Sequence, residues 1–241
     1  MTSPAHQPVR DAAQRVILLD IDGTLIDSND AHARAWVDSL AEHGYVVPFE
    51  QVRPLVGKGG DKILPELVGL DPESPEAKRM SETRGEIFRS RELPHLRATR
   101  GARDLLLRFR ADGYELAVAT SANAGDVRAT LEQALVADLI QTATSSDDAE
   151  RSKPDPDIVR AALMRSGHAA SHAVMLGDTP YDIEAATRAR VRIVALRCGG
   201  WWNDDALRGA EAIYDDPADL LGRYDDSIFG QQLSAREATA R

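Results

Sequence analysis

The chain has 241 residues, of which 43% are hydrophobic, so it can bury the core of one domain or of one domain carrying a smaller insert. Its formal net charge of -10 argues against nucleic acid and anionic membranes as partners, because both are bound through basic excess. No apolar run approaches a membrane span and the first fifteen residues lack a secretory apolar region, so we expect a cytoplasmic protein. Cys198 is the only cysteine, which excludes an internal disulfide and a multi-cysteine metal site.

The first recognisable element is a strand that ends in two carboxylates. Residues 1–14 carry no pattern and we expect them to be poorly ordered. Residues 16–19 form an apolar run typical of a buried central strand, and Asp20 and Asp22 follow it two residues apart, so both carboxylates can share one face. Gly23 then lets the chain turn and leaves nearby amides free to meet an anion. The pattern suits a metal and a phosphate, although such a pair also occurs as a plain turn.

A helical region follows. Residues 28–30 offer caps for a helix that runs to Gly44, and between residues 30 and 92 we find only helical stretches, interrupted at 57–60 and 71–75. We therefore predict a small all-α insert, residues 28–92.

From residue 101 onward, helices and strands alternate, which predicts an α/β fold with a doubly wound parallel sheet and helices on both faces. Residues 1–27 and 93–241 would form this domain, with ligands beyond the carboxyl ends of the strands. The polar tail from residue 224 is expected to be loosely held. The predicted helices are 101–111, 125–135, 155–165 and 180–190, and the predicted strands are 115–120, 140–144, 173–177 and 192–196.

Three further stretches would meet the first pair of carboxylates at this edge. Thr120 and Ser121 end one strand, where hydroxyls also serve as ordinary caps. Asp178 follows another strand and Asp182 lies in the first turn of the next helix, where capping is the alternative.

Lys153 is the third stretch. The chain has four lysines among many arginines, and this one precedes Pro154, which favours an extended backbone directed to the same rim. We expect the helix after it to use Asp155 as its cap and Pro156 as its first residue. A compact ammonium at this place can neutralise a phosphate, whereas a solvated surface lysine is the alternative.

The motif Asp-x-Asp-Gly-Thr at residues 20–24 resembles the first motif of the haloacid dehalogenase-like hydrolases, specifically their phosphatases. The stretches at residues 120, 153 and 178 match the remaining motifs in order and spacing. The resemblance implies that Asp20 attacks phosphorus to form an aspartyl phosphate and that Asp22 acts as acid and base. It also implies that the phosphoryl oxygens are bound by Gly23, Thr24, Thr120, Ser121 and Lys153.

The resemblance further implies a Mg²⁺ cofactor, and carboxylate and phosphate oxygens are the hard ligands that this ion prefers. The implied ligands are Asp20, the backbone carbonyl of Asp22, and Asp178. Asp182 would be a further ligand through water, or the partner that orients Lys153. We expect a Mg²⁺-dependent phosphatase acting on a small phosphorylated metabolite, as a monomer or homodimer.

The resemblance implies that the insert at this point is a cap that recognises the leaving group of the substrate. Lys58 and Lys62, in a glycine-rich loop, are candidates to contact the substrate, with a plain helix connection as the alternative. His32 resembles a histidine near the hinge in the branch with β-phosphoglucomutase, and a solvated helix position is the alternative.

Two other functions stay open. One is a β-phosphoglucomutase-like sugar phosphate mutase, although Val56 and Gly60 stand where mutases carry Lys and Arg. The other is a non-catalytic module that binds a phosphorylated ligand, which would be expected to lose Asp20 or Asp22. Trp201 and Trp202 could form an aromatic lip, a dimer contact or a simple loop.

Overall fold

The described strands join one parallel sheet. The computed structural model describes residues 15–231, and the predicted disorder of residues 1–14 concerns residues outside that range. The strands are β1 (Arg15–Leu19), β2 (Tyr114–Ala119), β3 (Thr142–Thr144), β4 (Ala173–Gly177), β5 (Arg192–Leu196) and β6 (Ala212–Tyr214). Within that range they lie in the order β3-β2-β1-β4-β5-β6, and every neighbouring pair is parallel. The predicted doubly wound α/β fold is confirmed.

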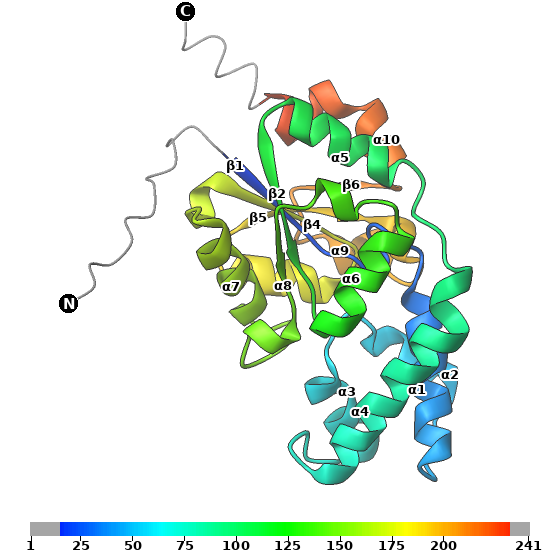
Figure 1. Cartoon of the computed structure of the whole chain (residues 1–241). Helices are drawn as coiled ribbons and strands as arrows, with labels where there is room; N and C mark the ends of the chain where they lie inside the picture. The colour runs from blue at the N-terminus through cyan, green and yellow to red at the C-terminus, as the bar shows by residue number, and fades with distance from the viewer. Residues whose placement is uncertain (1–14, 232–241) are drawn as a thin grey trace, which may run out of the picture.

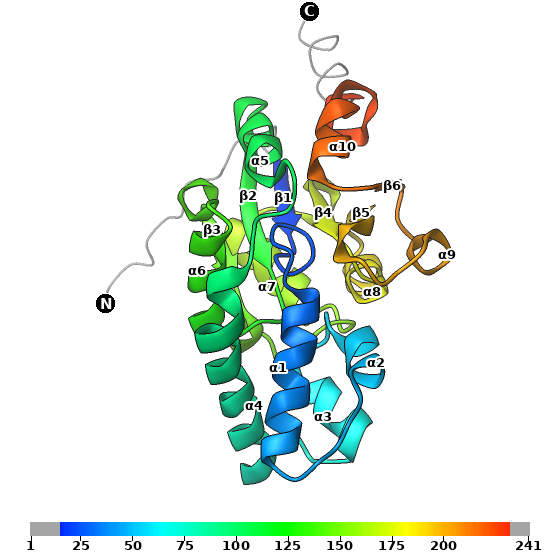
Figure 2. The same cartoon turned by 90° about the vertical axis from the view of Figure 1, so that its right-hand side faces the viewer.

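Helices cover both faces of this sheet (Figures 1 and 2). On one face pack α5 (Ala102–Ala111), α6 (Ala124–Gln133) and α10 (Pro217–Gly222). On the other face pack α7 (Asp157–Ser166), α8 (Pro180–Arg188) and the short α9 (Asp204–Leu207).

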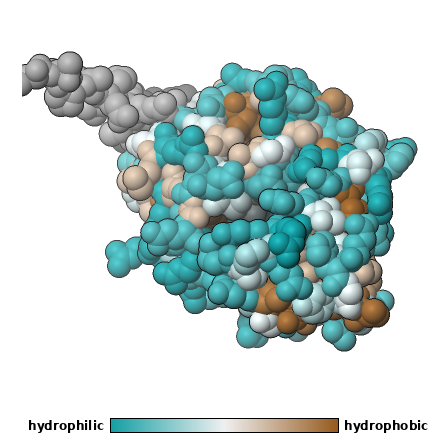
Figure 3. All heavy atoms as spheres, turned by 60° about the horizontal axis from the view of Figure 1, so that its bottom comes forward, coloured by the Kyte–Doolittle hydropathy of each residue, from teal (hydrophilic) through white to brown (hydrophobic). Residues whose placement is uncertain are grey.

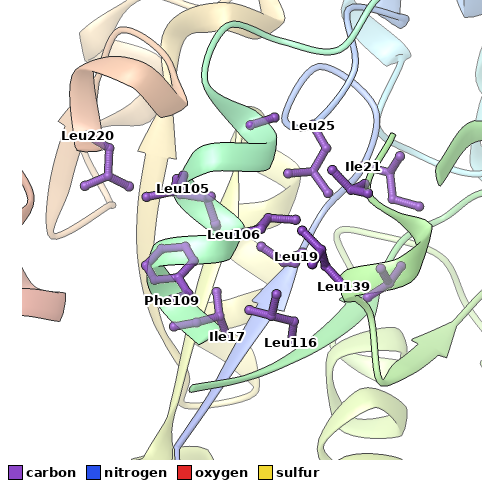
Figure 4. Close-up of a cluster of buried hydrophobic side chains, with 14 of the residues drawn as sticks. Ile17, Leu19, Ile21, Leu25, Leu105, Leu106, Phe109, Leu116, Leu139 and Leu220 are labelled. Atoms are coloured by element: carbon purple, nitrogen blue, oxygen red, sulfur yellow. The ribbon is translucent and has the colours of Figure 1, made fainter. Parts of the chain in front are cut away.

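Alternate residues of the central strand point to opposite faces. Ile17 and Leu19 join the hydrophobic cluster under α5, whereas Val16 and Leu18 join the cluster under α7 and α8. All four side chains are completely buried, which explains why the run is continuously apolar. Figure 4 shows the first cluster, in which side chains of β1, β2 and α5 gather and Leu220 of α10 lies beside α5.

The chain order reverses at β1. From β1 the chain passes to β2 and β3 on one side, and then returns to β4, β5 and β6 on the other. The carboxyl ends of β2, β1 and β4 are therefore neighbours at the switch point, where α/β sheets bind their ligands. Thr120, Asp20 and Asp178 directly follow these three strands.

Residues 28–92, here called the helical segment, lie beyond this edge of the sheet, at the lower end of the molecule in Figures 1 and 2. They contain α1 (Asn29–Glu42), α2 (Phe49–Val52), α3 (Gly60–Val68) and α4 (Pro75–Ile87), which continues as a π-helical turn, and no strand, as predicted. Trp36, Leu40 and Met80 belong to a hydrophobic cluster made within this segment. The face of the molecule that comes forward in Figure 3 is mainly hydrophilic, with a few hydrophobic patches.

The structure corrects the predicted role of Asp155. Helix α7 begins at Asp157, its N-cap is Pro156, and no side chain caps it. The Asp155 carboxylate instead accepts a hydrogen bond from Lys62 Nζ at 2.8 Å. The peptide bond between Lys153 and Pro154 is cis.

The prediction of a loosely held tail from residue 224 is wrong for its first part. Tyr224 and Phe229 are buried and pack against Phe109 of α5, with ring centroids 5.8 and 4.8 Å away. The sequence analysis also missed β6, α9 and α10, which are only three to six residues long.

Trp201 and Trp202 contact two different parts of the chain. Trp202 meets Tyr181 edge-on at 6.0 Å, and the guanidinium of Arg53 lies 5.6 Å from the Trp201 ring. Because Arg53 belongs to the helical segment, this loop is more than a simple connection.

Candidate active site

A buried ammonium group joins two of the predicted carboxylates. Lys153 Nζ lies 2.5 Å from Asp20 Oδ1 and 2.6 Å from Asp182 Oδ1, and the lysine is only 1% exposed. Burial alone would lower the pKa of Lys153, but Asp182 and Asp20 together hold it above the ordinary value. The lysine therefore stays charged. Asp182 was predicted either to bind the metal through water or to orient Lys153. The direct contact with Lys153 Nζ supports the second role.

Asp182 is itself fixed by the start of α8. Its Oδ2 accepts hydrogen bonds from the Thr179 hydroxyl at 2.7 Å and the Thr179 amide at 3.0 Å. The Thr179 hydroxyl in turn accepts a hydrogen bond from the Asp182 amide, which completes a capping box. Capping and lysine orientation are thus performed by the same carboxylate.

Asp20, Asp178 and Asp182 form a cluster that can hold a cation. Each offers an oxygen, these atoms lie within 4.8 Å of one another, and all three residues are buried. Burial raises the pKa of Asp20 to about 7, against the opposing effect of Lys153. Burial, followed by repulsion from Asp20 and Asp182, raises the pKa of Asp178 well above its usual range. One ammonium does not balance three carboxylates, and hard oxygen donors of this kind fit Mg²⁺.

Asp178 is oriented by side chains from the first loop and α1. Its oxygens accept hydrogen bonds from Asn29 Nδ2 at 2.7 Å and Thr24 Oγ1 at 3.2 Å. Two glycines leave the space that this carboxylate occupies, because a Cβ at Gly23 or Gly199 would lie 2.3 or 1.8 Å from Asp178 Oδ2. Gly23 also has a positive φ of 76°, which disfavours other residues there.

The Asp22 side chain lies outside this cluster. Its Oδ1 accepts a hydrogen bond from the Ser28 hydroxyl at 2.6 Å and lies 2.8 Å from His32 Nε2. Burial would raise the pKa of Asp22, but His32, Ser28 and Arg84 lower it below the ordinary value. The metal contact predicted for Asp22 is through its backbone carbonyl and not through its side chain. The position of the side chain therefore does not test this contact, which stays a prediction.

A small cavity of about 50 Å³ opens onto these groups. Thr120 and Ser121 line it together with Asp20 and Asp22. The Thr120 hydroxyl accepts a hydrogen bond from the Ala122 amide, and Ser121 Oγ accepts one from the Lys153 amide. Four predicted residues of the core therefore line one space, while Lys153, Asp178 and Asp182 do not line it and reach it through their cluster with Asp20.

The three predicted residues of the helical segment differ in whether they line the cavity. His32 is 8% exposed, stacks on Phe88 at 3.9 Å and lines the cavity, so the solvated alternative is wrong. Lys58 also lines the cavity, while its Nζ pairs with Glu66 at 2.6 Å. Lys62 does not line it and pairs with Asp155 instead.

Arg84 is a site residue that was not predicted from the sequence. This arginine of α4 lines the small cavity and lies over the Trp36 ring at 5.4 Å. Burial lowers its pKa, against opposing contributions from Asp126 and Asp22. Its only sequence signal is helical spacing from Met80, because Arg84 lies 62 residues along the chain from Asp22, which lines the same cavity.

Among residues 15–231, no helix combines the length and apolar character needed to cross a membrane.

A doubly wound sheet that gathers buried carboxylates and one ammonium at its switch point is typical of an enzyme whose ligands bind at the carboxyl ends of the strands. A family model described as haloacid dehalogenase-like hydrolase matches residues 17–196, so the chain belongs to that family. It is a phosphoric monoester hydrolase of the family.

Named relatives cover nearly the whole chain. A phosphoglycolate phosphatase of Rhodospirillum rubrum is 31% identical over 86% of this chain and 89% of its own length. An N-acetylmuramic acid 6-phosphate phosphatase of Pseudomonas aeruginosa is 26% identical over 89% of this chain and 96% of its own length. The crystal structure of a hydrolase from Pseudomonas syringae has a TM-score of 0.81 and 28% identity, covering 88% of this chain and 99% of that one.

Proposed function

We propose that the protein is a Mg²⁺-dependent phosphatase that hydrolyses the phosphate monoester of a small metabolite through an aspartyl phosphate on Asp20. The observation that carries the proposal is the position of Asp20, which lines the cavity and contacts Lys153 while sharing a carboxylate cluster with Asp178 and Asp182.

The chain's own residues then have separate tasks. Asp20 attacks phosphorus in line with the leaving oxygen, forming the covalent intermediate and breaking the ester bond. Asp22 gives its proton to the leaving oxygen and later takes a proton from the water that hydrolyses the intermediate. Lys153, the Thr120 hydroxyl and the amides near Gly23 bind the equatorial oxygens.

The residues that would hold Mg²⁺ are Asp20, the carbonyl of Asp22, and Asp178. When bound, the cation offsets the negative charge of phosphate and carboxylates, whose mutual repulsion amounts to about 4 kcal/mol per pair at 4 Å and an effective dielectric of about 20. Asn29 and Thr24 hold Asp178 in place for it.

We propose that residues 28–92 act as a mobile cap on the core formed by residues 1–27 and 93–241. The segment has its own hydrophobic cluster, and several of its contacts with the core are polar. Gly59 N donates to Ser152 Oγ at 2.9 Å, and the Tyr181 hydroxyl donates to the Pro54 carbonyl at 2.7 Å. Polar contacts of this kind can exchange with water, which favours opening for substrate entry.

A hydrolase fits the cavity better than a sugar phosphate mutase does. Val56 and Gly60, which stand where mutases carry Lys and Arg, both line the cavity and contribute no charge. The retained Asp20 and Asp22 also argue against a purely binding function.

The test combines substrate turnover with detection of the intermediate. Phosphate release from a panel of phosphate monoesters should require Mg²⁺, and Asp20→Asn should reduce it at least about a thousandfold. Acid quenching with a ³²P-labelled ester should leave label on the wild type and none on Asp20→Asn. Asp27→Asn, an exposed carboxylate nearby, is the matched control and should keep both signals. Labelling that persists in Asp20→Asn would assign the nucleophile to another residue.

A further inference from the structure

The small cavity at Asp20 lies next to a much larger one between the helical segment and the core. The larger cavity, of about 560 Å³, shares Trp36, Gly59, Gly60, Arg84 and Ser121 with the smaller, so the two adjoin. The smaller one, at about 50 Å³, has room for little more than the phosphoryl group. The remainder of the substrate must therefore occupy the larger cavity, whose volume is within the usual range for small-molecule sites.

The positively charged side chains of this larger cavity already form ion pairs. Its cationic side chains are Arg84 and Arg89, and both reach the same carboxylate. Arg84 Nη1 lies 3.3 Å from Asp126 Oδ2, and Arg89 Nη1 lies 2.7 Å from Asp126 Oδ1. Asp126 is completely buried, so this contact is poorly screened by solvent and lowers the attraction of both arginines for another anion.

Most of the negatively charged side chains of this cavity are not ion-paired in this way. Glu82 and Glu86 of α4 and Glu150 of the core line the cavity, are exposed, and have no ion-pair partner among residues 15–231. Asp61 also lines it and accepts only the Ser152 amide, at 3.2 Å, within that range. Unpaired carboxylates on both walls repel an anionic leaving group and attract a cationic one.

The other lining groups suit a hydroxylated ligand. Ser81, Ser121 and Ser146 contribute hydroxyls, which can both donate and accept hydrogen bonds. Arg84 Nε is buried and has no hydrogen-bond partner within the described range. A two-carbon acid such as glycolate would leave most of this space to water.

From these contacts we propose the substrate class: the phosphate monoester of a polyhydroxylated alcohol of sugar size that carries an ammonium group or no charge, and not of one bearing a carboxylate or second phosphate. This inference rests on the proposed function, because the phosphoryl group is placed at Asp20.

Three six-carbon esters of similar size separate charge from shape: glucosamine 6-phosphate, glucose 6-phosphate and 6-phosphogluconate. Their dissociation constants are measured by calorimetry with Mg²⁺ and Asp20→Asn, which is not expected to turn them over. We expect the glucosamine ester to bind most tightly and the gluconate ester most weakly, with about a fivefold or larger separation that shrinks as salt is added.

A charge-matched pair of variants tests which carboxylates are responsible. Glu82→Gln with Glu86→Gln should reduce the separation, whereas Asp104→Asn with Asp205→Asn removes the same charge at exposed positions outside the cavity and should preserve it. Equal binding of the three esters, tighter binding of the gluconate ester, or binding of none of them would overturn the proposal. Failure of the proposed function is a different result: wild-type enzyme would then release no phosphate from any ester, including an aryl phosphate, with Mg²⁺ present.

Discussion

Asn29 provides a direct test of how the cation site is held. Its Nδ2 donates to Asp178 Oδ2 at 2.7 Å and to the Gly199 carbonyl at 3.2 Å. Asn29→Ala would remove one of the two side-chain donors of a buried carboxylate and leave Thr24, at 3.2 Å, as the other. Loss of such an outer contact weakens metal binding by about 10- to 100-fold, or roughly 1.4 to 2.7 kcal/mol.

The assay is a calorimetric titration with Mg²⁺ at neutral pH. Thermal unfolding is measured on the same samples. Asn203→Ala is the matched control: it removes an asparagine whose side chain caps α9 and has no hydrogen bond to Asp178, and it should cost about 1 kcal/mol of stability without changing Mg²⁺ affinity. If Asn29→Ala were folded and bound Mg²⁺ as tightly as the wild type, the positioning role of Asn29 would be refuted.

Three further predictions concern pH, the glycine-rich loop and the metal site. Burial raises the pKa of Asp20 from 3.8 to about 7, so without metal this group's contribution to stability is lost as pH rises from 3.8 through 7. Mg²⁺ competes with that proton, and its effect on Tm should be larger at pH 8 than at pH 6; equal effects would contradict this. Lys58→Ala should lower kcat/KM for a sugar-sized ester about tenfold, whereas Lys62→Ala, outside the cavity, should leave it within about twofold; equal losses would mean that the loop only supports packing. Gly199→Ala would place a Cβ 1.8 Å from Asp178 Oδ2 and should weaken Mg²⁺ binding in the same calorimetric titration, so an unchanged Kd would show that the loop relaxes freely.

The central strands were predictable because each is buried on both faces. The predicted strands 173–177 and 192–196 match β4 and β5 residue for residue, since parallel strands between two helical layers are continuously apolar. The edge strand β6 has three residues, two of them only partly buried, and such a stretch has no distinctive pattern.

The same reasoning explains which site residues were found. Asp20, Thr120 and Asp178 directly follow neighbouring strands, so the fold alone brings them together. Asn29 and Arg84 lie on helices of the helical segment, and their approach to the site depends on how that segment packs against the core. A period of 3.6 residues identifies the inner face of a helix but does not say which other element that face meets.

The proposed acid and base, Asp22, also depends on the helical segment. Ser28, His32 and Arg84, which lower the pKa of Asp22, all lie within residues 28–92, whereas Asp22 itself belongs to the core. With the segment in this position these contacts favour the carboxylate, the form that takes a proton from the attacking water, whereas the earlier step, in which Asp22 protonates the leaving oxygen, requires the acid form. If the segment moves away as a cap, His32 and Arg84 withdraw together and the balance between burial and pairing at Asp22 changes. Closure of the cap and the protonation state of the acid and base are therefore physically linked in this mechanism.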